Sequence, residues 1–135
     1  MKLITQEAPM GCGIACAASL VGVSYRDMRK LFLNGNIKDK TIGFYNSDFV
    51  EALSKKRITV TGCSAKNFGN RRIKPGTIVF SQRSKYYPVG HFLLKTPKSW
   101  MDPWKTGATI SEAKAGWRKR FPGKKEWIIE TSKMK

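Results

Sequence analysis

The sequence predicts an α+β fold, in which an N-terminal helical half packs on a C-terminal antiparallel sheet. The chain has 135 residues, of which 41% are hydrophobic, so it can bury one core but not two. We therefore expect a single domain over residues 1–135. Helical signals occupy residues 12–53, whereas short β-rich runs separated by turn residues follow from residue 58.

Two helices are predicted before residue 40. The first, Cys12–Val21, is apolar and rich in small residues, which suits a buried helix that ends at Gly22. The second runs from Tyr25 to Phe32. It is expected to direct three apolar side chains to one face: Met28, Leu31 and Phe32.

A third helix is predicted with Asn46 or Ser47 as its N-cap, a position that both residue types favour. Its buried face is expected to consist of Phe49, Val50 and Leu53.

Strands are predicted in the second half from β-branched and aromatic runs next to turns. They cover residues 58–61, 77–80, 91–94 and 99–101, and a turn at residues 96–98 makes the last two a hairpin. A further helix is predicted from about Ser111 to Arg120, with Glu112 in its first turn. A final strand follows at residues 127–130.

The chain is strongly basic, with 26 Lys and Arg against 9 Asp and Glu and a net charge of +17. Residues 68–135 contribute about +12 of this charge and residues 1–67 about +5. Such a field attracts acidic partners, which include nucleic acid, anionic lipid and acidic peptides. A solvated basic face that serves solubility is the alternative interpretation.

Three cysteines, Cys12, Cys16 and Cys63, form an odd set with irregular spacing. This is a poor disulfide framework and suits a reducing compartment. Together with the one histidine it also lacks the ligand spacing of a zinc site. The N-terminus does not resemble a signal peptide, and no apolar run reaches the eighteen residues needed to span a bilayer. We therefore expect a soluble, cytoplasmic protein that needs no metal or organic cofactor.

Cys12 is the candidate nucleophile, because unpaired N–H groups and the helix dipole stabilise a thiolate at the start of a helix. Cys16 lies one turn later among alanines and should face the core. A thiol nucleophile needs a base, and His91 is the one histidine in the chain. Asp102 follows eleven positions later across the predicted hairpin, where it could orient the His91 imidazole.

Gln6 stands six residues before the run Cys12-Gly13-Ile14-Ala15-Cys16-Ala17-Ala18. In this motif the sequence resembles the bacteriocin-processing cysteine peptidases, which also form the N-terminal domain of some peptide-exporting ABC transporters and have a Gln six residues before a Cys-Gly-x-Ala-Cys-x-Ala helix. A His-Phe strand with a short hairpin to Asp-Pro is matched by His91-Phe92 and Asp102-Pro103. The closing segment, from Ile110-Ser111-Glu112 through Trp117 to Trp127-Ile128-Ile129, is also similar.

The resemblance implies a papain-like cysteine peptidase fold and an endopeptidase with a Cys-His-Asp mechanism. It implies the nucleophile at Cys12, the general base at His91, the orienting residue at Asp102 and an oxyanion donor at Gln6. The substrate would be a peptide or protein, with Gly-Gly in a leader peptide as the family's usual cleavage site.

A different class of function remains open from the sequence: a basic nucleic-acid-binding protein or ribonuclease toxin on the same scaffold. Basic clusters near aromatic residues support this alternative. They are Lys55-Lys56-Arg57, Arg71-Arg72 with Lys74, and Arg118-Lys119-Arg120 with Lys124-Lys125.

Overall fold

The computed structural model describes residues 1–85 and 87–134, and it combines helices with one antiparallel sheet. The α-helices are α1 (Cys12–Val21), α2 (Tyr25–Arg29), α3 (Gly35–Lys38), α4 (Asn46–Ser54) and α5 (Ala65–Phe68), and η1 (Ile110–Glu112) is a short 3₁₀ helix. None of the helices in residues 1–85 and 87–134 has the length and apolar character required to cross a membrane.

Within residues 1–85 and 87–134 the sheet has six strands in the order β1-β6-β2-β3-β4-β5, and each neighbouring pair is antiparallel. The strands are β1 (Ile58–Ser64), β2 (Ile78–Ser81), β3 (His91–Lys95), β4 (Trp100–Thr106), β5 (Lys114–Arg118) and β6 (Lys125–Lys133). The last strand of the chain therefore lies between β1 and β2, inside the sheet.

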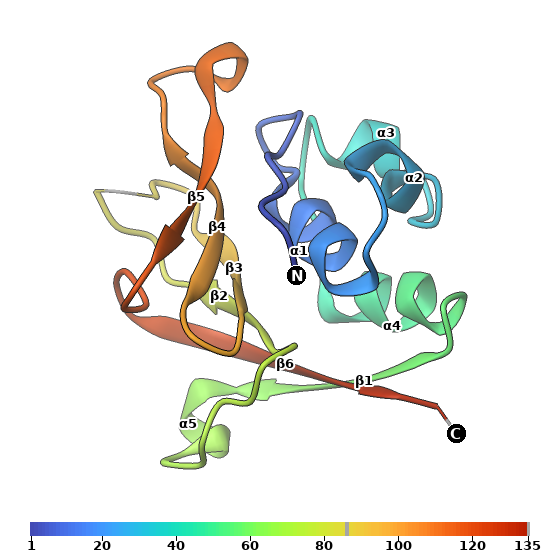
Figure 1. Cartoon of the computed structure of the whole chain (residues 1–135), viewed down its shortest axis with the longest axis vertical. Coiled ribbons are helices and arrows are strands. Elements are labelled where there is room, and N and C mark those ends of the chain that lie inside the picture. The colour runs from blue at the N-terminus through green and yellow to red at the C-terminus, as the bar shows by residue number, and fades with distance from the viewer. Residues whose placement is uncertain (86, 135) are drawn as a thin grey trace.

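Helices α1 to α4 gather on one side of the sheet, and α1 packs directly on β3 and β4 (Figure 1). The main core fills this interface and includes Ile14, Phe49 and Leu94. A second, smaller cluster containing Val79 and Leu93 covers the opposite face near α5. Because β2 and β3 are buried on both faces, they read as continuous apolar runs. The α+β prediction, with a helical half on an antiparallel sheet, is thus confirmed.

The predicted helix from Ser111 to Arg120 is wrong. Only Ile110–Glu112 form a helical turn, and Lys114–Arg118 form the edge strand β5 paired with β4. The segment contains Ala and Lys, which favour a helix and were the basis of the prediction. Gly116 in its middle disfavours a helix. Cross-strand pairing and side-chain contacts to β4 outweigh the local preference.

The predicted second helix is too long, because α2 ends at Arg29 and the chain then turns tightly before α3. Met28 and Phe32 are nevertheless buried, as predicted. The third helix spans the expected region, but Asn46 is its first helical residue and Tyr45 its N-cap. Val50 was expected to be buried and is exposed.

Candidate active site

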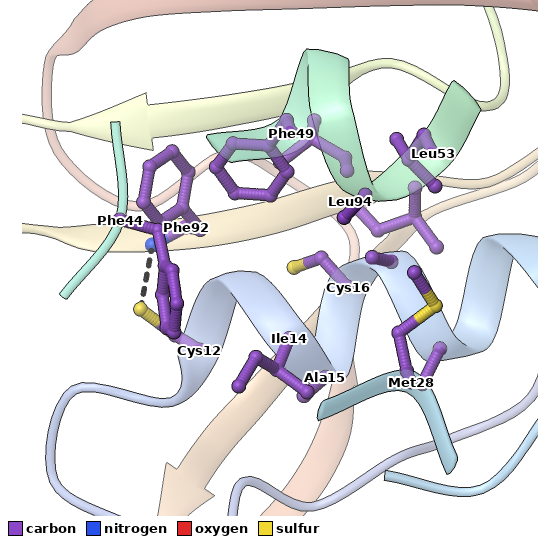
Figure 2. Packing of buried hydrophobic residues seen from close by; sticks show 14 of the residues in the cluster. Cys12, Ile14, Ala15, Cys16, Met28, Phe44, Phe49, Leu53, Phe92 and Leu94 are labelled. Carbon is purple, nitrogen blue, oxygen red and sulfur yellow. Dashed lines mark hydrogen bonds between the residues drawn. The ribbon is translucent and has the colours of Figure 1, made fainter. Parts of the chain in front are cut away.

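Cys12 is the first residue of α1, and its sulfur faces the start of β3. Its Sγ atom accepts a hydrogen bond from the backbone N–H of Phe92 at 3.4 Å (Figure 2). The first N–H groups of a helix have no carbonyl partner within it, so they favour negative charge there. No side chain caps α1, and its first turn carries no acidic residue. Gly11 permits the close approach of the Tyr25 hydroxyl, which would clash with an added Cβ.

His91 opens β3, and Asp102 lies on β4 beside it. The His91 Nε2 atom and the Asp102 Oδ1 atom are 2.7 Å apart, and both residues are buried. Gly90 makes this placement possible for two reasons. Its φ of 82° lies in the left-handed region that glycine adopts readily, and the Phe80 ring beside it leaves no room for a Cβ. Pro103 has no N–H for the β4–β5 pairing, and the register shifts after Asp102. The structure therefore brings His91 and Asp102 together as the hairpin spacing predicted.

The Asp102 carboxylate accepts four hydrogen bonds from the described part of the chain, two on each oxygen. On Oδ1 these come from His91 and from the backbone N–H of Trp104 at 2.9 Å. On Oδ2 they come from the Tyr87 hydroxyl at 2.5 Å and from Arg118 Nε at 2.7 Å. The Tyr87 ring also stacks on the His91 ring, with centroids 4.3 Å apart and 11° between the planes. Asp102 and the His91 imidazole are thus held from several sides.

The pKa values of Asp102 and His91 are shifted in opposite directions. Burial would raise the pKa of Asp102, but hydrogen bonds from His91, Tyr87 and Arg118 hold it well below its usual range. Burial would lower the pKa of His91, but the negative charge of Cys12, the Asp102 hydrogen bond and a Cys12 hydrogen bond raise it to about 9. The arrangement therefore favours an imidazolium at His91 beside the Asp102 carboxylate at neutral pH.

The two other thiols lie in different surroundings. Cys16 is fully buried in the main core, one turn after Cys12 and on the same side of α1 (Figure 2). Burial raises the pKa of the Cys16 thiol well above its ordinary value. Cys63 is half-buried on β1 and packs against the smaller core cluster. The sequence prediction that Cys16 faces the core is confirmed.

Gln6 is buried beside this group, but its amide faces the loop before α1. The Nε2 atom donates to the carbonyl oxygens of Ala8 at 3.0 Å and Pro9 at 3.1 Å. The Gln6 backbone N–H donates to the carbonyl oxygen of Pro103 at 3.2 Å, which ties the N-terminal segment to the strand that carries Asp102. Both amide hydrogens of Gln6 therefore have partners in this structure.

Two cavities flank His91. The larger, of about 550 Å³, is bordered by Cys12 and His91 together with mainly apolar residues. The smaller, of about 360 Å³, is bordered by Gln6, His91, Lys105 and Arg118. Within the described residues, no three His, Cys, Asp or Glu side chains lie close enough together to hold a metal ion. The chemistry this site can support is nucleophilic attack by a thiolate with proton transfer through His91.

Comparison with solved structures shows the fold. The peptidase domain of Streptococcus ComA, a bifunctional ABC transporter involved in a quorum-sensing pathway, superposes with a TM-score of 0.58. The match covers 98% of each chain, at 19% sequence identity. The chain shares its overall fold with that peptidase domain. No protein-family model matches the sequence, and neither does any curated protein.

Sequence reasoning missed Tyr87 and misinterpreted Arg118. Arg118 was assigned to a basic cluster with Lys119 and Arg120 on a helix. In a strand, successive side chains point to opposite faces, so Arg118 turns inward to Asp102 while Trp117, the residue before it on β5, is exposed. Tyr87 lies in the loop before β3, where periodicity gives no signal. A tyrosine four residues before the one histidine was the available hint.

A pH titration of the single histidine tests this electrostatic arrangement. The NMR resonance of His91 is expected to titrate near pH 9, above its ordinary value of 6.5. In Cys12→Ala the midpoint should fall, because the negative charge and the hydrogen bond of the thiolate are lost. Cys63→Ala should leave the midpoint unchanged. An unchanged midpoint in Cys12→Ala would mean that the thiolate does not stabilise His91.

The same shift has a consequence for stability, whose sign follows from linkage. Because the pKa of His91 is raised in the folded state, protonation of His91 adds to the free energy of unfolding, and this contribution is complete below the unfolded-state pKa of 6.5. This contribution is lost as the pH rises toward 9.

Proposed function

We propose that this protein is a cysteine endopeptidase with a Cys-His-Asp mechanism on a papain-like fold. The observation that carries the proposal is the placement of Cys12 (α1) and His91 (β3) at the wall of one open cavity, with Asp102 (β4) buried behind His91 and hydrogen-bonded to it. The shared fold with the ComA peptidase domain supports it.

The reaction begins with a Cys12 thiolate and a His91 imidazolium. The sulfur attacks the peptide carbonyl carbon, a C–S bond forms, and the carbonyl π electrons move to the oxygen. The tetrahedral intermediate then breaks its C–N bond, and the leaving nitrogen takes the proton of His91. Neutral His91 next accepts a proton from the water that attacks the thioester. The C–S bond breaks, the carboxyl product leaves, and the thiolate–imidazolium pair is restored.

The oxyanion is proposed to be held by the backbone N–H of Cys12 and the side chain of Gln6. The first of these is at the start of α1, where helix geometry leaves it unpaired. The Gln6 amide donates to the carbonyl oxygens of Ala8 and Pro9 in this structure. To bind the oxyanion, it must break one of these two hydrogen bonds and donate that hydrogen to the substrate oxygen instead. Losing one such donor typically costs about 2.7–4 kcal/mol of transition-state stabilisation.

Labelling with a peptidyl chloromethyl ketone tests the nucleophile directly. Cys12 is only 8% exposed, whereas Cys63 is half-buried, so simple accessibility favours Cys63. A substrate-like electrophile is expected to modify Cys12 first, as located by peptide mapping, because binding and thiolate activation act there. Iodoacetamide serves as the reagent without peptide recognition. Preferential labelling of Cys63 by the peptidyl reagent would contradict the proposal.

The finer substrate assignment comes from the sequence resemblance. It makes a leader peptide cut after Gly-Gly the first substrate to examine. The lining of the cavity beside Cys12 is a second source of information on which side chains precede the scissile bond.

A further inference from the structure

The two cavities beside His91 differ in their relation to the nucleophile. Cys12 borders the 550 Å³ cavity, and His91 borders both. In the proposed reaction the acyl group becomes bonded to Cys12, while the leaving amine receives its proton from His91. The acyl half of a substrate therefore occupies the 550 Å³ cavity, which we name the acyl-side cavity, and the leaving half extends past His91 into the smaller one.

The acyl-side cavity is apolar. Its apolar lining residues come from the loop before α1, the loop before α4, the loop before β3, and strands β2, β3 and β6. They are Pro9, Met10, Ile42, Phe44, Tyr45, Phe80, Val89, Phe92, Trp127 and Ile129. Beside these, the described lining contains the titratable side chains of Cys12, His91 and Glu126 and the neutral polar ones of Asn46 and Ser47. A lining of this kind selects an apolar ligand group, because polar groups would lose their hydration without new partners.

The walls of the acyl-side cavity are held in place by contacts among the lining residues and with the main core. Trp127 Nε1 donates to Asn46 Oδ1 at 3.2 Å, which links β6 to the first turn of α4. The Phe80 and Phe92 rings contact each other with centroids 4.7 Å apart, and Phe92 packs on Phe49 of the main core at 5.1 Å. A cavity that exists before the ligand arrives does not lose affinity to ordering its own walls.

We propose that the acyl-side cavity binds a large apolar side chain, carried by one of the two residues before the scissile bond. This proposal rests on the peptidase function proposed above and narrows its substrate class. Two glycines have no side chains and would leave the apolar walls in contact with water. A phenylalanine or leucine at either position covers those walls and gains the hydrophobic free energy. Cleavage after Gly-Gly is thus the less favoured reaction for this chain.

Three peptides that differ only before the scissile bond test the proposal. They carry Gly-Gly, Phe-Gly or Gly-Phe in an otherwise identical sequence, and the full chain is assayed for kcat/KM with each. Even one methylene in an apolar pocket typically changes kcat/KM by 10-fold or more. The better phenylalanine peptide is therefore expected to exceed Gly-Gly by at least about 10-fold. Equal or faster cleavage of the Gly-Gly peptide would overturn the proposal.

A matched pair of variants places the effect in the cavity. Ile42 lines the acyl-side cavity and is 60% exposed, and Ile37 is 58% exposed but lies outside its lining. Ile42→Asn is expected to lower kcat/KM for the better phenylalanine peptide several-fold, and Ile37→Asn to leave it unchanged. Because both side chains are exposed, neither change should unfold the protein. Indistinguishable variants would place the selectivity elsewhere and overturn the proposal.

Binding separates failure of this inference from failure of the peptidase function. The three peptides are titrated calorimetrically into Cys12→Ala, with and without Ile42→Asn. If no peptide is cleaved by the wild type but the phenylalanine peptides bind more tightly than Gly-Gly in an Ile42-dependent way, the peptidase function fails and the cavity assignment stands. If all three peptides bind equally, the cavity assignment fails whether or not cleavage occurs.

Discussion

Cys12→Ala is expected to lower kcat for peptide hydrolysis by a factor on the order of 10⁴ to 10⁶, the range typical of removing a nucleophile. Cys16→Ala and Cys63→Ala should keep most of the activity. The physical reason is position: Cys12 lies at the start of α1 on the cavity wall, whereas Cys16 is sealed in the core with a raised pKa. A continuous assay with an internally quenched peptide measures all three variants.

The control for this result is folding. Cys12→Ala should keep the cooperative thermal transition of the wild type, because it removes one sulfur atom at the edge of the core. Cys16→Ala is the more disturbing change to packing, since it opens a small void in the interior. Full activity in a folded Cys12→Ala protein would end the peptidase proposal.

His91→Ala is expected to be as damaging as Cys12→Ala, and the double variant no worse than either. Residues that act as one catalytic unit give non-additive losses, because a thiol without its base and a base without its thiol are equally ineffective. Asp102→Ala should retain a measurable rate, since in the proposed mechanism Asp102 orients His91 and does not itself transfer a proton. Rates at saturating substrate, determined for the four variants, make this comparison.

The Asp102 variant needs a separate check, because its carboxylate is buried and accepts four hydrogen bonds. Removing it leaves the Arg118 guanidinium without its buried partner, which typically destabilises a protein by about 3–5 kcal/mol. Rates are therefore compared below the melting temperature of the least stable variant. An Asp102→Ala rate equal to that of the wild type would mean that another group orients His91.

The sequence allowed α1 to be predicted to the residue, because Gly22 ends it in a left-handed conformation and a run of small residues marks it as buried. The two strands of the hairpin, β3 with His91 and β4 with Asp102, could be predicted for a similar local reason, because each is a β-rich run bounded by turn residues. Both signals lie within a few residues of the elements that they define.

The rest depends on contacts between distant segments. The edge strand β5 forms because β4 offers it a partner, and the Arg118 side chain finds a carboxylate sixteen residues earlier in the chain. The orientation of the Gln6 amide is decided by two loop carbonyls, Ala8 and Pro9, that its spacing from Cys12 does not reveal. Local propensity and periodicity contain no information about such partners.

The position of β6 between β1 and β2 has a consequence for how the chain matures during translation. While the ribosome holds residues 125–133, β1 and the β2–β5 ribbon have no common partner, and the sheet stays in two parts. Trp127 and Ile129 on β6 also complete the wall of the acyl-side cavity. The nascent chain therefore carries Cys12, His91 and Asp102 well before the cavity wall is complete, so the proposed proteolytic activity is expected only after β6 has inserted.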